Sequence, residues 1–153
     1  MLAHLSIRDI VLIERLDIDF PAGLSVLTGE TGAGKSILLD ALSLALGARG
    51  DASLVRHGAS QGSVTAVFSV PHNHPARLLA RDNGFDDGSD SGGELILRRS
   101  QSADGRSRVF INDQPASVAL LREIGRTLVE IHGQHDDRAL IDAAAHRDLL
   151  DAF

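Results

Sequence analysis

Residues 29–36 read Gly29-Glu30-Thr31-Gly32-Ala33-Gly34-Lys35-Ser36, which is the pattern G-x-x-x-x-G-K-[ST] of a phosphate-binding loop. The glycines allow consecutive backbone N–H groups to curl around phosphate oxygens without Cβ clashes. In such a loop the lysine, here Lys35, reaches the β- and γ-phosphates, and the hydroxyl of Ser36 binds Mg²⁺. The sequence therefore predicts a binding site for a nucleoside triphosphate and Mg²⁺ in this loop.

The residues on both sides of the loop fit the strand–loop–helix setting that the motif requires. Residues 24–28 read as a short buried strand, and residues 37–46 as an apolar helix that Gly47 ends. A helix that begins at the loop points the positive end of its dipole at the phosphates. The alternative, a glycine-rich turn that carries Lys-Ser by chance, does not explain these flanks.

Composition indicates one compact domain. The chain has 153 residues, of which 43% are hydrophobic and 24% charged, enough to bury a core. It has no cysteine, which excludes disulfides and thiolate metal sites. We see no signal peptide and no membrane-spanning run, so we expect a cytoplasmic protein without membrane contact. A formal net charge of −6 argues against strong nucleic-acid binding by this chain alone.

Alternating and helical patterns predict further elements around the loop. In the first hairpin, with a turn near Arg8-Asp9, we expect Leu16, Ile18 and Phe20 to face inward. A loop is expected at residues 84–93 and a hairpin turn at Asp104-Gly105. Strands are expected at residues 2–7, 13–20, 63–70, 94–99, 107–111 and 128–132, a turn at 112–115, and helices at 75–81, from Ser117 to about Arg126, and from Asp142.

The second motif of many P-loop enzymes, an apolar strand that ends in an Mg²⁺-binding Asp, has only weak candidates here. Residues 109–113 end in Asp113, but the turns on either side favour a hairpin strand. Residues 16–19 end in Asp19, but they alternate between apolar and charged residues and so indicate an edge strand. The chain therefore provides a phosphate-binding loop without a clear catalytic carboxylate.

A second segment places a glutamine just beyond a short apolar run. It reads Val129-Glu130-Ile131-His132-Gly133-Gln134-His135-Asp136. Together with residues 28–42, 5–14 and 46–52, it closely resembles the RecN family, bacterial double-strand-break repair ATPases related to the SMC proteins. The resemblance covers essentially the whole chain. It implies an α/β fold, with a mixed sheet around the loop helix and an antiparallel β subdomain. Residues 1–153 would then be the N-terminal lobe of a split ABC-type head, without its coiled coil and C-terminal lobe.

The resemblance also implies roles for individual residues. Gly29 to Ser36, with Ile37, would bind the phosphates of ATP. Lys35 and Gln134 would act in catalysis, and Ser36 and Gln134 would complete the shell of the Mg²⁺ ion. For Gln134, the alternative is a surface glutamine in a glycine-containing turn.

The resemblance further implies how the protein works. In this family the C-terminal lobe carries the signature motif and the catalytic carboxylates, so we expect the chain alone to be inactive. The implied partners are that C-terminal lobe, a second head in a homodimer, and DNA, specifically double-strand ends, bound by the full-length protein. ATP-driven head dimerisation would gate how DNA is held or bridged, at the bacterial nucleoid.

Several arginines carry more than one interpretation. Arg49 and Arg56 lie where SMC-like heads place arginines near the nucleotide or DNA, or they are solvated loop residues. A basic hairpin could contact DNA phosphates or the missing lobe, or it could be an exposed charged ribbon. Its members are Arg98, Arg99, Arg106 and Arg108.

His132 and His135, with Asp136 nearby, suggest a metal site, but zinc would need further fixed ligands. Two other functional classes also remain open for the chain. One is a small stand-alone P-loop kinase or GTPase, which requires a hidden catalytic Asp and turnover by this chain alone. The other is a non-catalytic interaction module that binds a nucleotide only as a structural ligand.

Overall fold

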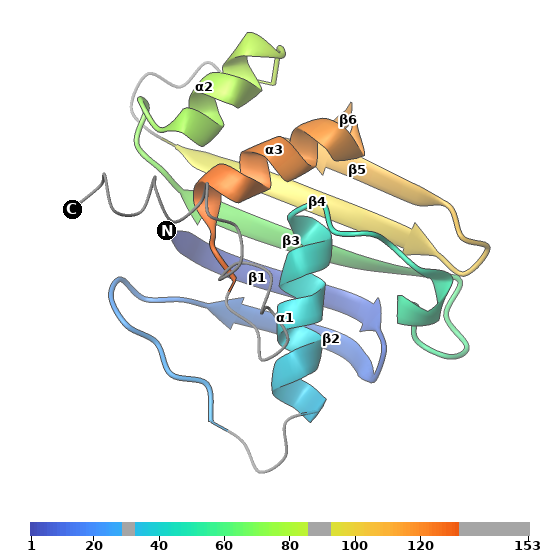
Figure 1. The fold of residues 1–153 in the computed structure, drawn as a ribbon. Helices are drawn as coiled ribbons and strands as arrows, with labels where there is room; N and C mark the ends of the chain where they lie inside the picture. The colour runs from blue at the N-terminus through green and yellow to red at the C-terminus, as the bar shows by residue number, and fades with distance from the viewer. Residues whose placement is uncertain (29–32, 86–92, 132–153) are drawn as a thin grey trace, which may run out of the picture.

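The computed structural model describes residues 1–28, 33–85 and 93–131. Within them, one six-stranded sheet has the order β2-β1-β3-β4-β5-β6, with every adjacent pair antiparallel. The described α-helices lie on one face of this sheet (Figure 1). The elements are β1 (Leu2–Ile10), β2 (Ile13–Asp19), α1 (Ala33–Ala45), the 3₁₀ turn η1 (Ala52–Leu54), β3 (Gln61–Ser69), α2 (Pro75–Asp82), β4 (Glu94–Ser102), β5 (Ser107–Ile111), β6 (Gln114–Ala116) and α3 (Val118–Leu128).

The strands alternate between a buried and a more exposed face, as their sequences predict. On β3, the residues Val64, Ala66 and Phe68 are buried in the core, whereas the residues between them are partly exposed. Leu16 on β2 and Phe20 just after it pack against the core, Ile18 is partly buried, and the intervening Asp17 and Asp19 are exposed. The strand β2 is at the edge of the sheet, which confirms the edge-strand expectation for residues 16–19.

The helix α1 packs across the sheet by its C-terminal half. Ala41, Leu44 and Ala45 are buried, and the helix contacts β1, β3 and β4. It begins at Ala33, within the phosphate-binding motif, and so starts four residues before the apolar stretch suggested. Gly47, with φ of 94°, follows the last turn and confirms the predicted helix end.

The helix α3 crosses the end of α1 in close contact. The hydroxyl of Ser117 accepts a hydrogen bond from the N–H of Leu120 (3.2 Å), which confirms the predicted cap. The buried face of α3 contains Leu120, Leu121 and Ile124, also as predicted. A Cβ at Gly125 would lie 2.6 Å from the carbonyl oxygen of Leu46, so only glycine allows this approach.

The turns of the two hairpins differ from the sequence prediction. The first turn lies after Ile10 rather than near Arg8-Asp9, because Ile10 is buried and pairs with Ile13, which keeps β1 in the sheet. The turn expected at residues 112–115 is confined to Asn112 and Asp113, which both have positive φ. The following residues instead form β6, because they pair with β5.

Two predicted strands are wrong where the structure describes them. Residues 24–28 form no strand and are exposed, with Leu24 at 95% and Val26 at 73% (Figure 1). Leu128 is still in α3, and residues 129–131 form no strand. A strand needs a neighbour to satisfy its backbone, and the described sheet supplies none at either place. The elements expected at residue 132 and from Asp142, and most of the loop 84–93, lie outside the described residues.

We expect Gly47→Ala to destabilise the chain by about 1–3 kcal/mol more than Gly105→Ala does. Both glycines have φ above 90°, so both substitutions introduce the same backbone strain. Only at Gly47 would the new Cβ meet a neighbour, 2.8 Å from the Cα of Arg122, whereas the space at Gly105 is open. Urea unfolding midpoints of the two variants measure the difference. Equal losses would show that the crossing of α1 and α3 tolerates a side chain.

Candidate nucleotide-binding site

The second half of the phosphate-binding motif forms the first turn of α1. Gly34, Lys35 and Ser36 follow Ala33, the first residue of the helix. The N–H groups of a first helical turn have no partner within the helix, and the helix dipole is positive there. The first turn of α1 contains no acidic residue that would repel an anion. Residues 29–32, the first half of the motif, lie outside the described residues.

The start of α1 has room for a ligand. A Cβ built at Gly34 would meet nothing within 4 Å, and both Gly34 and Ser36 are exposed. The core holds the other end of the helix, where Leu44 and Ala45 are buried. The side chains of Lys35 and Ser36 and the backbone N–H groups of the first turn therefore belong to an accessible helix start, and this donor set fits a triphosphate with Mg²⁺.

The weak candidates for a catalytic carboxylate are not placed for that role. Asp19 ends the edge strand β2, where its carboxylate lies 2.6 Å from Nδ1 of His4. Asp113 lies in the turn between β5 and β6 and pairs with Arg98 (3.2 Å). Neither aspartate follows a buried parallel strand, which agrees with the prediction that both segments belong to hairpins.

Other predicted site residues fall beyond what the structure describes. Gln134, the expected partner of the Mg²⁺ shell, lies outside the described residues, as do His132, His135 and Asp136. In the described ranges, no group of three or more histidine, aspartate and glutamate side chains could hold a metal ion. No helix there is long and apolar enough to cross a membrane.

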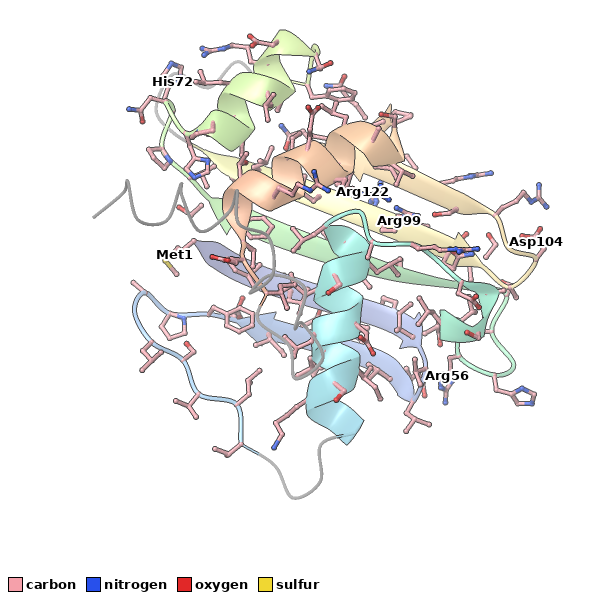
Figure 2. All side chains as sticks on the ribbon, viewed as in Figure 1. Met1, Arg56, His72, Arg99, Asp104 and Arg122 are labelled. Carbon is pink, nitrogen blue, oxygen red and sulfur yellow. The ribbon has the colours of Figure 1, made fainter. Side chains whose placement is uncertain are left out.

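The two loop arginines differ in their surroundings. Arg56 forms ion pairs with Glu14 (3.3 Å) and Asp9 (3.7 Å), so it ties the segment after η1 to the first hairpin (Figure 2). Arg49 is exposed in the loop that follows α1. Its charge helps to lower the pKa of Asp51, although the main cause is hydrogen bonding from Ser53. Arg56 thus has a structural role in the described chain.

The basic hairpin does not form a single cluster. Successive residues of β4 point to opposite faces of the sheet, so Arg98 is on the helix-free face and Arg99 is on the core face. Arg99 is only 3% exposed, and its Nε donates to the hydroxyl of Ser107 (2.5 Å). Arg106, in the turn, pairs with Asp104. The prediction of one shared basic surface is therefore wrong for Arg99 and Arg106.

The loop after α1 covers two buried polar side chains that the sequence did not predict, Arg99 and Gln101. The Nη1 of Arg99 and the Oε1 of Gln101 are buried and have no hydrogen-bond partner in the described structure. Burial, and then the charge of Arg122, lowers the pKa of Arg99. Arg122, which is labelled in Figure 2, donates from Nε to the carbonyl of Gly47 at 3.2 Å. Residues 46–52 stood out in the sequence only through their family resemblance, and no sequence pattern pointed to the burial of Arg99 or Gln101.

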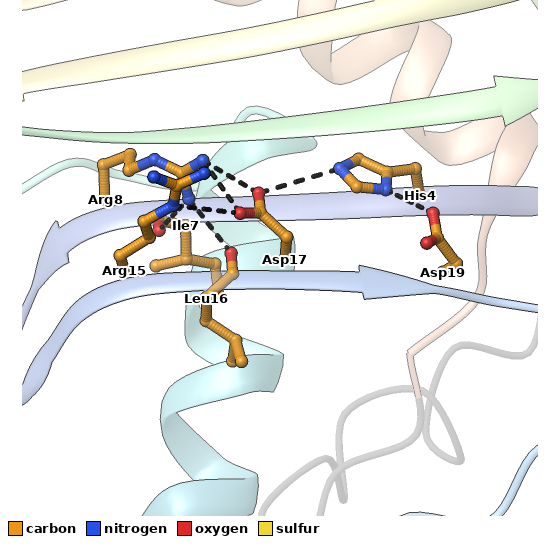
Figure 3. A network of polar contacts seen from close by, with 7 residues as sticks. All are labelled: His4, Ile7, Arg8, Arg15, Leu16, Asp17 and Asp19. Carbon is orange, nitrogen blue, oxygen red and sulfur yellow. Dashed lines mark hydrogen bonds and ion pairs between the residues drawn. The ribbon is translucent and has the colours of Figure 1, made fainter.

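The helix-free face of the sheet carries an ion-pair network on β1 and β2 (Figure 3). Nη2 of Arg8 donates to both carboxylate oxygens of Asp17, at 2.9 and 3.0 Å, and Nε of Arg15 donates at 3.3 Å. Hydrogen bonds, chiefly from Arg8 and then from Ser6, lower the pKa of Asp17 to about 2. The folded state thus binds a proton at Asp17 less readily than the unfolded chain does.

We expect Arg8→Gln to raise the pKa of Asp17 from about 2 toward the ordinary value of 3.8. In the native chain, the network stabilises the fold fully above about pH 4 and loses this effect as the pH falls through the folded pKa. The variant should lose this acid dependence. Carboxyl NMR titration measures the pKa directly, with Arg56→Gln as the control that leaves Asp17 unchanged. A pKa that stays near 2 in Arg8→Gln would show that Arg8 is not the main cause.

The comparison with known proteins gives consistent matches across the chain. Residues 4–136 match the protein family described as "AAA domain". The DNA repair protein RecN of Bacillus subtilis (strain 168) is 42% identical over 153 residues, which is all of this chain but 26% of the relative. This chain therefore spans about a quarter of the length of the curated relatives it matches.

Solved structures share the fold at lower identity. The Smc head domain with an extended coiled coil from Pyrococcus furiosus, bound to the C-terminal domain of ScpA, superimposes with a TM-score of 0.70 at 23% identity, over 97% of this chain and 40% of that one. A structure described under ATP-driven dimerization and DNA stimulated activation of SMC ATPases superimposes with a TM-score of 0.69 at 22% identity. The match covers 98% of this chain and 97% of that one. The α/β class and the head-lobe fold predicted from the sequence are therefore confirmed.

Proposed function

The chain belongs to the AAA domain family, and from this premise we propose that it is the ATP-binding N-terminal lobe of an SMC-like ATPase that acts in DNA repair. The observation that carries the proposal is the position of Lys35 and Ser36 in the first turn of α1, at an accessible and acid-free helix start. The identity of about 40% to proteins named DNA repair protein RecN supports the biological role.

The proposed roles of the residues follow from the motif. Gly29 to Ser36, with Ile37, hold the phosphates through backbone N–H groups and the helix dipole. Lys35 neutralises charge on the β- and γ-phosphates, and the hydroxyl of Ser36 is a ligand for Mg²⁺. Gln134 completes the Mg²⁺ shell and orients water. ATP with Mg²⁺ supplies the phosphoryl group whose transfer to water drives the cycle.

The exposed apolar residues before the loop support a C-terminal lobe as the first partner. Leu24, Val26 and Leu27 are exposed, although their sequence is that of a buried strand. Exposed apolar surface of this kind marks an interaction site, and an unpaired strand sequence favours a partner that supplies strands. We propose that residues 24–28 become a strand in a sheet that the C-terminal lobe completes.

The second proposed partner is another head. In SMC-like ATPases, a head dimer encloses the nucleotide, and the C-terminal lobe contributes the carboxylates for hydrolysis. The structural match to a protein described under ATP-driven dimerization supports the same arrangement for the whole protein that contains this lobe. Cycles of head association and release would then gate how DNA double-strand ends are held in the bacterial cytoplasm.

A stand-alone kinase or GTPase is less consistent with the described residues. Such an enzyme needs a carboxylate at the end of a buried strand, next to the phosphate-binding loop. Asp19 and Asp113 instead lie at the sheet edge and in a hairpin turn. We therefore retain the split-head proposal as the function of the chain.

We expect the chain to hydrolyse ATP only when it is mixed with, or joined to, a C-terminal lobe, and Lys35→Ala to reduce that activity at least ~100-fold. The lysine provides the positive charge that the β- and γ-phosphates require. Phosphate release measures hydrolysis, and Arg81→Ala, an exposed position on α2, is the matched control. Steady turnover by the chain alone would contradict the split head and indicate a self-sufficient enzyme.

We expect Val26→Asp to weaken association with a C-terminal lobe by at least about tenfold, because an unpaired carboxylate is costly to bury in an apolar interface. The thermal midpoint of the chain alone should not change, since Val26 is 73% exposed. Leu12→Asp, at 78% exposure in the first hairpin turn, is the matched control. Calorimetric titration of the two lobes measures association. Equal effects at both positions would argue against residues 24–28 as the docking strand.

A further inference from the structure

The strand β6 covers only part of the edge of β5 (Figure 1). It has three residues, and these pair with residues 109–111 of β5. The chain then leaves the sheet, because Ser117 caps α3. At the start of β5, Ser107 and Arg108 pair with β4 on one side, and no described strand lies on the other side. The sheet therefore has a short open edge at this place.

The backbone of Ser107 points toward this open edge. Successive residues of an antiparallel strand direct their N–H and C=O groups alternately to the two sides. In the β4–β5 ladder, the N–H of Asn112 donates to the carbonyl of Ile96 at 2.9 Å, and the N–H of Ser102 donates to the carbonyl of Arg106 at 2.7 Å. The even-numbered residues of β5 thus bond to β4. The N–H and C=O of Ser107 therefore face an added strand.

The outer edge of β6 is closed to such a strand by its sequence. Gln114 and Ala116 are paired with Ile111 and Val109, so by the same alternation their backbone groups face β5. Only the middle residue of β6 faces outward, and this residue is Pro115, which has no N–H to donate. A strand that extends the sheet would therefore lie beside the start of β5, in line with β6.

A pocket of about 470 Å³ lies at the open edge. Val109, Ala116 and Val118 line it from the core side of the sheet, where all three pack with the core. Arg108 and Phe110 line it from the helix-free side, because they alternate with Val109 along β5. The pocket thus wraps around the edge and offers an apolar surface on one side of an added strand and a guanidinium on the other.

The charges around the pocket favour an acidic occupant. Arg108 is exposed and has no ion pair with any described residue. The helix α3 begins at Val118, beside the pocket, and its first turn contains no acidic residue to offset the positive end of the helix dipole. The lining itself contains no carboxylate. A segment that carries carboxylates next to an apolar side chain would complement both the charge and the apolar surface.

We propose that an extended segment of a partner protein, with acidic and apolar residues in alternation, adds to the sheet as a short strand at this open edge. Main-chain hydrogen bonds to Ser107 would supply affinity, and alternate side chains would supply specificity. Directly opposite residues share a face of a sheet, so an apolar residue opposite Ser107 would enter the pocket beside Val109 and Val118. Its acidic neighbours would project to the other face, where Arg108 can pair with a carboxylate.

This site is separate from the proposed contact with the C-terminal lobe. The strand order places β6 and β2 at opposite edges of the sheet, and residues 24–28 follow β2 in the chain. The partner of the β5 edge is therefore a further protein, and its binding does not depend on the nucleotide site. Lys35→Ala should accordingly leave this binding unchanged.

The test measures binding of a fluorescent synthetic peptide, Gly-Ser-Glu-Val-Glu-Ser-Gly, to the full-length protein by anisotropy. We expect a Kd below about 1 mM, and a loss of at least about tenfold when the valine nitrogen is methylated, because the methyl group removes the N–H that donates to Ser107. A peptide with lysine in place of glutamate should also bind at least about tenfold more weakly. Arg108→Glu should reverse this preference, whereas Arg81→Gln, an exposed position on α2, is the matched control and should change nothing.

Several outcomes would overturn the proposal. No binding of the glutamate peptide at about 1 mM would show that the edge accepts no strand of this chemistry. Equal binding of the methylated peptide would show that no main-chain pairing occurs, and equal binding by Arg108→Glu would place the peptide elsewhere. If Arg108→Glu instead changes the self-association of the protein, measured by sedimentation, the occupant is a second copy, and the assignment to a different protein is wrong. None of these results bears on ATP hydrolysis.

Discussion

The contact between the end of α1 and the middle of α3 constrains the rest of the molecule. Gly47 and Gly125 allow two backbones to approach so closely that no side chain fits between them. This crossing seats Leu44 and Ala45 in the core, and burial of a leucine side chain alone is worth about 1.5–3 kcal/mol. As a result, the helix is anchored at the end far from its first turn, and Lys35 and Ser36 are held out from the sheet at an accessible helix start.

The sheet separates two kinds of surface. Its core face carries the helices, and its other face carries the charged network of β1 and β2 together with Arg98 and Arg108. A chain with net charge −6 can therefore still carry exposed arginines on one face of its sheet. Asp17 pairs with Arg8 and Arg15 on β1 and β2, and Asp113 pairs with Arg98, whereas the exposed Arg108 has no ion pair with a described residue. Net charge describes the average of the surface, while binding depends on its arrangement.

Local patterns were enough to predict much of the fold, and failures arose where structure depends on distant partners. The alternation of β3 and the cap of α3 at Ser117 are encoded in a few adjacent residues. Residues 24–28 have the composition of a strand, but no described strand lies beside them to pair with. The prediction of one shared basic surface on the hairpin failed for a different reason. Arg98 and Arg99 are adjacent in sequence but lie on opposite faces of the sheet. The phosphate-binding motif was readable because its chemistry needs fixed residue types at fixed spacing, whereas the buried Arg99 has no local signal.

The two flanks of the phosphate-binding loop are supported unequally, and this has a thermodynamic consequence for the proposed split head. On one side, α1 is fixed in the core, and on the other, residues 24–28 are exposed and unpaired. A C-terminal lobe that pairs with residues 24–28 would fix the second flank and so hold the loop in the form that binds phosphates. A nucleotide would favour the same form. Because coupling free energies are reciprocal, docking of the lobe must raise nucleotide affinity by the same factor by which the nucleotide raises affinity for the lobe. The incomplete strand would thus make assembly of the head and loading of the nucleotide one coupled equilibrium.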